Sequence, residues 1–109
     1  MIRDSEWTKE RILEELSQRE SEFALRFGVR RIGIFGSRAR GDATATSDID
    51  VLVEMDKPTF GAYMDLKFML EDLFACSVDL VLAESLKPRI RPIVLQEVDY
   101  AWTRQALHR

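Results

Sequence analysis

The sequence predicts an α/β (α+β) fold, a small mixed β-sheet backed by helices. Three observations predict it. Short apolar runs typical of strands recur along the chain, amphipathic segments with helical spacing lie between them, and glycines or prolines mark many of the boundaries. A chain of 109 residues is long enough for one domain with a core and too short for two. We therefore expect a single domain over residues 1–109, with an N-terminal helix and a motif-bearing core over 29–102.

The first predicted element is a helix over residues 5–27. Ser5 is a suitable N-cap, and Gly28 is a suitable stop. Glutamate and arginine side chains fill the outer face of this segment. The inward-facing stripe has helical spacing and consists of Ile12, Leu13, Leu16, Phe23 and Phe27.

Two strands come next, over residues 31–35 and 48–54. The segment between them is predicted to form a short helix or turn that ends at Gly41, followed by a loop over 43–47. Because this connection is short, we expect the two strands to be adjacent and antiparallel.

A second helix is predicted to begin near Pro58 or Thr59, since proline suits a first helical turn. A third strand follows over 78–82, and a last helix begins at Pro88. The helical crossover implies that the second and third strands run parallel. The inward stripe of the second helix would be Tyr63, Leu66, Leu70, Leu73 and Phe74, flanked by Phe60 and Met64. That of the last helix would be Ile90, Ile93, Val94 and Val98. Tyr100 and Trp102 would lie at or beyond the end of the last helix.

The most informative motif combines Gly36-Ser37 with Asp48-Ile49-Asp50. The first pair closes one predicted strand, and the two aspartates open the next. Strand residues two apart point to the same face, so Asp48 and Asp50 are expected to present their carboxylates side by side. A Gly-Ser turn suits a phosphate, because glycine lets the backbone approach closely and serine adds a hydroxyl. Either half alone is a weak signal, whereas the pair at this spacing is a strong one.

A third acid, Asp79, interrupts the third predicted strand. The ordinary explanation is an aspartate near a strand end that reaches solvent or a backbone N–H; the alternative is that it joins Asp48 and Asp50 on the open face of the sheet. Two carboxylates about 4 Å apart repel by about 4 kcal/mol at an effective dielectric of about 20. Either one acid stays protonated, or water screens the group, or a divalent cation binds. Oxygen ligands alone favour Mg²⁺, with Mn²⁺ as the alternative.

Composition narrows the possible functions. A net charge of −3 argues against direct nucleic-acid binding, which favours a basic excess. Arg38 and Arg40 lie beside the Gly-Ser turn and are candidate nucleotide contacts, since the planar guanidinium suits phosphate oxygens; otherwise they belong to a solvated face.

The remaining composition points to the cytoplasm. The single cysteine, Cys76, allows no disulfide and is expected to be a small core residue in a reducing compartment. No apolar run is long enough to span a membrane, and the N-terminus lacks the apolar segment of a signal peptide. The only histidine is His108 near the C-terminus, so any catalytic base is expected to be a carboxylate.

Together these residues resemble the minimal nucleotidyltransferase (MNT) family, a branch of the DNA polymerase beta-like nucleotidyltransferase superfamily. The resemblance covers about residues 29–102. It rests on the segments Gly36-Ser37-Arg38-Ala39-Arg40-Gly41-Asp42-Ala43, Ser47-Asp48-Ile49-Asp50-Val51-Leu52-Val53 and Val78-Asp79-Leu80-Val81, and on the stretch 86–98, which is similar to the family's C-terminal helix.

The resemblance implies a palm-like sheet and a role for each motif residue. Asp48 and Asp50 would hold two Mg²⁺ ions that bridge a nucleoside triphosphate. Asp79 would complete one metal site and accept the proton of an attacking hydroxyl. Gly36 and Ser37 would grip the terminal phosphates, assisted by Arg38.

The resemblance also implies a partner. Family members of this size are often encoded beside a HEPN-type toxin, so this chain would be an antitoxin that transfers AMP from ATP to a tyrosine hydroxyl of that partner. The acceptor would be held by another protein or by a homodimer. The rival hypothesis is a non-catalytic antitoxin that neutralises its partner by binding alone, through the apolar C-terminal stretch. Nothing in the sequence identifies the base of the nucleotide.

Overall fold

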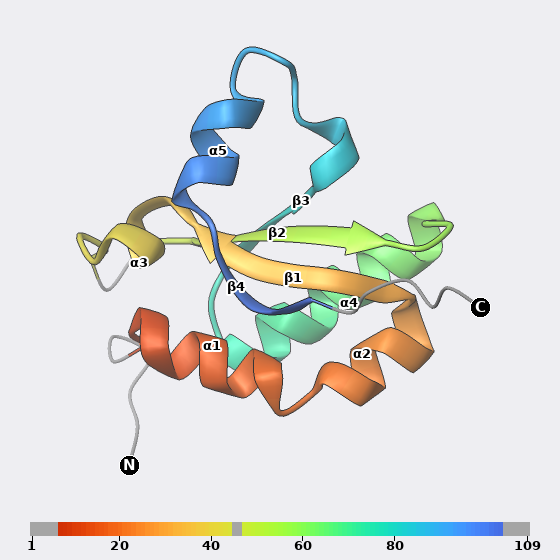
Figure 1. The fold of residues 1–109 in the computed structure, drawn as a ribbon. Helices are drawn as coiled ribbons and strands as arrows, with labels where there is room; N and C mark the ends of the chain where they lie inside the picture. Colours follow the sequence, from red (N-terminus) through yellow and green to blue (C-terminus); the bar gives the residue numbers. More distant parts are fainter. Residues whose placement is uncertain (1–6, 45–46, 104–109) are drawn as a thin grey trace.

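The computed structural model describes residues 7–44 and 47–103. Helices and strands alternate along most of the chain (Figure 1). In chain order the elements are α1 (Lys9–Ser17), α2 (Glu20–Phe27), β1 (Val29–Phe35), α3 (Gly36–Arg40), β2 (Ile49–Met55), α4 (Phe60–Phe74), β3 (Val78–Leu82), the 3₁₀ helix η2 (Ala83–Ser85), α5 (Arg91–Glu97) and β4 (Asp99–Thr103).

The strands form a mixed sheet in the order β3-β2-β1-β4. β1 pairs with β2 antiparallel, and β2 pairs with β3 parallel, as the connection lengths predicted. β4 lies antiparallel to β1 on the other side. The predicted mixed α/β sheet is therefore confirmed, with one additional strand.

The two faces of the sheet differ in how they are covered. Helices α1, α2 and α4 lie against one face, and α5 and η2 lie on the other (Figure 1). Alternate residues of β2 enter the large core under the three helices, together with Leu66, Leu70 and Phe74 from α4. Only a small apolar cluster forms on the opposite face, from Leu52, Ala83, Leu86 and Val94. The prediction left that face open, whereas α5 and η2 cover part of it.

The predicted N-terminal helix over 5–27 is two helices. The chain breaks at Gln18 and Arg19, where the Leu16 carbonyl accepts from the Arg19 amide and from the Trp102 indole N–H at 3.2 Å. In a continuous helix this carbonyl would bond the amide of residue 20. A tryptophan from β4 thus contacts the backbone at the break. Thr8 is the N-cap of α1 and accepts from the Arg11 amide; the predicted cap, Ser5, lies outside the described residues.

The last helix begins at Arg91, three residues later than predicted, which places Pro92 in the first turn. Had the helix begun at Pro88, the Pro92 ring would clash with a carbonyl one turn back. Ile90 and Ile93 were expected to face inward and are instead exposed, Ile93 at 63%, because only Val94 of α5 packs beneath the helix.

Tyr100 and Trp102 lie in β4, a strand that was not predicted. The other strands and α4 agree with expectation to within two residues at each end. Gly41 ends α3 in the left-handed conformation, and Thr59 caps α4 by accepting from the Ala62 amide. No helix within 7–44 and 47–103 has the length and apolar character needed to cross a membrane.

Candidate active site

The parallel pairing of β2 with β3 brings two of the predicted acids together. Asp50 is the register partner of Asp79, and each is the second residue of its strand. Their sequence neighbours Ile49 and Val78 enter the large core, so the alternation of strand side chains places both carboxylates on the opposite face. Asp48 directly precedes β2, and its charge acts on Asp50.

The Gly36-Ser37 corner lies against one of these acids, Asp50. Phe35, the last residue of β1, pairs with Asp50, and Gly36 follows at a φ of 74°. A β-carbon built on Gly36 would collide with the Asp50 carboxylate, and this backbone conformation is one that L-residues rarely adopt. Glycine is therefore required here both by the turn and by the approach of the carboxylate.

The electrostatics of Asp50 reflect this crowding. Its pKa is raised above the ordinary value, chiefly because burial disfavours the charged carboxylate. Three negative neighbours, Asp79, Asp48 and Glu97, raise it further, and Arg40 acts in the opposite direction. A bound cation would reverse this cost, because it stabilises the charged form.

The acids fit a hard divalent cation, although they do not form a closed ligand set. Within the described part of the chain, no three carboxylate, thiol or imidazole side chains are grouped closely enough to hold one ion. Carboxylates without a cation between them repel, by about 4 kcal/mol for a pair about 4 Å apart at a dielectric of about 20. Mg²⁺ also seldom uses an all-protein cage, since it binds through one or two carboxylates with water and substrate phosphates. The carboxylates of Asp50 and Asp79, which are register partners on neighbouring strands, suit this mode of binding.

A fourth carboxylate, Glu97, contacts the Gly-Ser corner from the end of α5. Its Oε1 accepts from the Gly36 amide at 2.8 Å, and its Oε2 accepts from Arg40 Nη1 at 2.8 Å. These two bonds, with Arg40 as the larger cause, lower the pKa of Glu97. Arg40 also pairs with Asp42 at 3.1 Å. The predicted nucleotide contact Arg40 is thus held by two acids.

Arg38, a predicted nucleotide contact, is more buried than that role implied. Its side chain is only 5% exposed; Nη1 donates to the Trp7 carbonyl at 2.9 Å, and Nη2 donates to the Ser47 carbonyl at 2.7 Å. Nε has no hydrogen-bond partner in the described structure. Arg38 therefore joins the start of α1 to the segment before β2. Ser37 lies half-buried, and its carbonyl accepts from the amides of Gly41 and Asp42.

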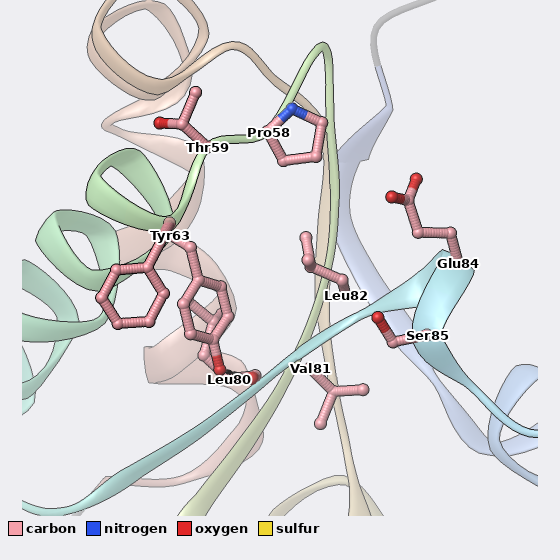
Figure 2. A pocket seen from close by; sticks show the side chains of 9 residues that line it. Pro58, Thr59, Tyr63, Leu80, Val81, Leu82, Glu84 and Ser85 are labelled. Carbon is pink, nitrogen blue, oxygen red and sulfur yellow. Dashed lines mark hydrogen bonds between the residues drawn. The ribbon is translucent and has the colours of Figure 1, made fainter.

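Two cavities differ in their relation to this region. One, of about 410 Å³, is lined by Arg38, Arg40 and residues at the start of α1. The other, of about 420 Å³, lies along β3 and contains none of the predicted site residues. Figure 2 shows the second cavity: the Tyr63 ring reaches from α4 to β3, where its hydroxyl donates to the Leu80 carbonyl, and Glu84 and Ser85 come from η2.

Comparison with known proteins agrees with this geometry. The nucleotidyltransferase domain family matches residues 9–101, which is most of the chain. The chain belongs to this family. A protein adenylyltransferase MntA of Thermococcus cleftensis is 44% identical over 94 residues, covering 85% of this chain and 95% of the relative.

Solved structures share the fold, and one of them is similar enough in sequence to support the same assignment. One assigned as a minimal nucleotidyltransferase superposes with a TM-score of 0.73 at 35% identity, covering 87% of this chain and 97% of its own. A chain of the complex between a tri-AMPylated HEPN toxin and an MNT antitoxin of Shewanella oneidensis gives a TM-score of 0.57 at 23% identity, covering 83% and 72%. At that identity the second likeness shows the fold alone.

Sequence reasoning missed one residue that contacts this candidate site. Glu97 lies 61 residues after Gly36, and no spacing rule joins a glutamate near a helix end to a distant turn. The available signal was weak: Glu97 falls within the stretch 86–98 that resembled the family's C-terminal helix.

Proposed function

We propose that this chain is a Mg²⁺-dependent adenylyltransferase that moves AMP from ATP to a hydroxyl group of a HEPN-type partner protein, as the antitoxin of a toxin–antitoxin pair. The observation that carries the proposal is the pairing of Asp50 with Asp79 beside the Gly36 corner. The naming of the Thermococcus cleftensis relative as a protein adenylyltransferase, and of a structural neighbour as an MNT antitoxin with an AMPylated HEPN toxin, supports the substrate and the partner.

In the proposed reaction, the acceptor hydroxyl oxygen attacks the α-phosphorus of ATP. The new bond forms between that oxygen and the α-phosphorus. The bond from the α-phosphorus to the oxygen that joins it to the β-phosphorus breaks, and pyrophosphate leaves. Asp79 accepts the hydroxyl proton. The amide and hydroxyl of Ser37, next to Gly36, hold the terminal phosphates, because phosphoryl-type transfer depends on positioning and charge neutralisation.

Asp48, Asp50 and Asp79 would hold the Mg²⁺ ions. When bound, such ions neutralise the triphosphate and stabilise the attacking and leaving oxygens of an in-line displacement. Arg40 is a proposed phosphate contact from the exposed surface of α3. Arg38 stays a proposed contact through its remaining N–H donors, since two of the five on its guanidinium already serve backbone carbonyls.

The test is transfer of label from [α-³²P]ATP to a purified HEPN-type partner protein in the presence of Mg²⁺. The wild-type chain is expected to label that protein, and the double variant Asp48→Asn with Asp50→Asn is expected to lose labelling by at least about a hundredfold. Asp65→Asn is a matched control, because Asp65 is an exposed aspartate on α4 away from the site. Undiminished labelling by the double variant would remove the assignment of these acids.

One observation favours the second candidate, neutralisation by binding alone. Ile90, Ile93 and Leu95 are exposed on and beside α5, as expected of a surface that contacts a partner. The double variant separates the two functions in a growth assay with the toxin. If the variant protects cells as fully as the wild-type chain, binding is the function; if protection disappears while the complex still forms, transfer is required.

A further inference from the structure

We propose that Glu97 is a positioning residue of the site: from α5 it fixes the Gly36 amide and the Arg40 guanidinium beside Asp50. This inference rests on the proposed transferase function and adds a residue to it. Glu97 itself would touch neither the nucleotide nor the acceptor.

Both carboxylate oxygens of Glu97 contact the predicted nucleotide-binding segment. One oxygen accepts from the Gly36 amide and the other from Arg40, each at 2.8 Å. The side chain is 24% exposed, so solvent screens these bonds only in part. A single carboxylate thus joins the first and last residues of α3.

The backbone holds Glu97 in place. It is the last residue of α5, and β4 begins two residues later with Asp99, the register partner of Ile34 in β1. At Gly33 the strands approach so closely that a β-carbon would collide with the Asp99 carbonyl. The end of α5 and the end of β1 are therefore fixed to each other by strand pairing, and Glu97 reaches across that corner.

This arrangement gives the Gly36 amide and the Arg40 guanidinium a partner. The first N–H groups of a helix have no partner within the helix, and the Gly36 amide is the first of α3. Because Glu97 occupies this amide, the Gly36 peptide is held while the Ser37 amide stays available to a phosphate. Arg40 is needed as well, since its charge balances a carboxylate that would otherwise repel a triphosphate.

Three substitutions separate the two contacts. Glu97→Gln keeps an oxygen acceptor for the Gly36 amide but loses the ion pair, Glu97→Ala loses both contacts, and Arg40→Met loses the ion pair from the other side. Gln96→Ala is the matched control, because Gln96 is the exposed neighbour on the same helix. For each variant, kcat and KM for ATP are measured in the labelling assay, and the folded fraction is measured by circular dichroism.

We expect Glu97→Ala to lower kcat about tenfold to a hundredfold per folded molecule, because small displacements of the phosphate cradle cost this much. Glu97→Gln should recover most of kcat and retain a raised KM, matching Arg40→Met. A purely structural role would lower the folded fraction and leave kcat per folded molecule unchanged, which overturns the inference, as does a Glu97→Ala variant equal to the control.

Two further results have a defined interpretation. If Glu97→Ala does not fold, the KM shared by Glu97→Gln and Arg40→Met decides, and values equal to wild type overturn the inference. A wild-type chain that neither binds nor transfers nucleotide overturns the proposed function and this inference together, whereas an active wild type with unaffected variants overturns the inference alone.

Discussion

The two faces of this sheet are made by the same strands and carry opposite chemistry. On one face, alternate residues of β2 pack under three helices without exposure, as Ile49, Val51 and Val53 do. On the other, the residue between the first two is Asp50, half-buried among negative neighbours. A shift of one position along a strand separates the core from the candidate site.

The difference teaches that stability and chemistry can be changed separately in this fold. Apolar burial on the helical face supplies favourable free energy. The acid face costs free energy, because folding raises the pKa of Asp50 by burial and by neighbouring charge. Substitutions on the first face should change stability and spare the chemistry, and those on the second should do the reverse.

The largest effect on stability is expected from Leu66→Ala in α4. Leu66 is fully buried under the sheet, and removing such a side chain leaves a cavity that costs about 2–5 kcal/mol. Urea unfolding measures the loss. Phe68→Ala is the control on the same helix, since Phe68 is more than half exposed. Equal losses for the two variants would contradict the assignment of the core face.

Arg38→Met tests an exception to this separation of stability from chemistry, because Arg38 is a charged residue with a structural role. Its loss leaves the carbonyls of Trp7 and Ser47 without their donor, at a cost of about 1–3 kcal/mol. Urea unfolding should show this loss, while Arg40→Met, on the exposed surface of the same helix, should change the midpoint little. If instead Arg38→Met unfolds like wild type and loses only ATP affinity, Arg38 is mainly a nucleotide contact.

The sequence was sufficient for features that depend on local spacing. The helical crossover predicted the parallel strands that align Asp50 with Asp79. That Asp48 and Asp50 share a face stays a prediction, because Asp48 precedes β2. Features that depend on distant contacts were missed. At the break near Arg19 the Leu16 carbonyl accepts from Trp102, which comes from a five-residue strand with no apolar run to reveal it.

The same limit applies to the candidate site. Gly36 could be found from the sequence because it belongs to a Gly-Ser pair. Glu97 belongs to no such motif, and a glutamate near a helix end is ordinary on a surface. The depth of Arg38 was equally hidden, since only the fold brings the carbonyls of Trp7 and Ser47 to one guanidinium.

A smaller effect, with a defined pH dependence, is expected from Glu71 on the helical face. Glu71 accepts from the Val78 amide at 3.1 Å and pairs with Lys67 at 3.0 Å, and these contacts lower its pKa below the ordinary 4.5. A depressed carboxyl pKa stabilises the fold above pH 4.5, and this contribution is lost as the pH falls through the lower folded value.

Glu71→Gln should therefore unfold more easily than wild type at pH 7, by about 1 kcal/mol or less, and the gap should narrow as the pH falls below the ordinary 4.5. Thermal melts from pH 7 to pH 3 measure it. Asp72→Asn, at the adjacent exposed position, is the control. A gap that stays constant over this range would show that the carboxylate charge contributes nothing.

The smallest effect on stability, and the one of opposite sign, is expected from Asp50→Asn. In the presence of EDTA the variant should melt at the same temperature as wild type or slightly above it, because the substitution removes a charge that burial, Asp79 and Asp48 all disfavour. Adding Mg²⁺ or Mn²⁺ should reverse the order: a ligand that binds only the folded state stabilises it in proportion to RT ln(1 + [L]/Kd), and Asp50→Asn removes a charged ligand oxygen. A wild-type melting temperature insensitive to either ion at millimolar concentration, with and without ATP, would mean that these acids do not gather a cation. The acid face would then be a cost to folding that no bound ion offsets.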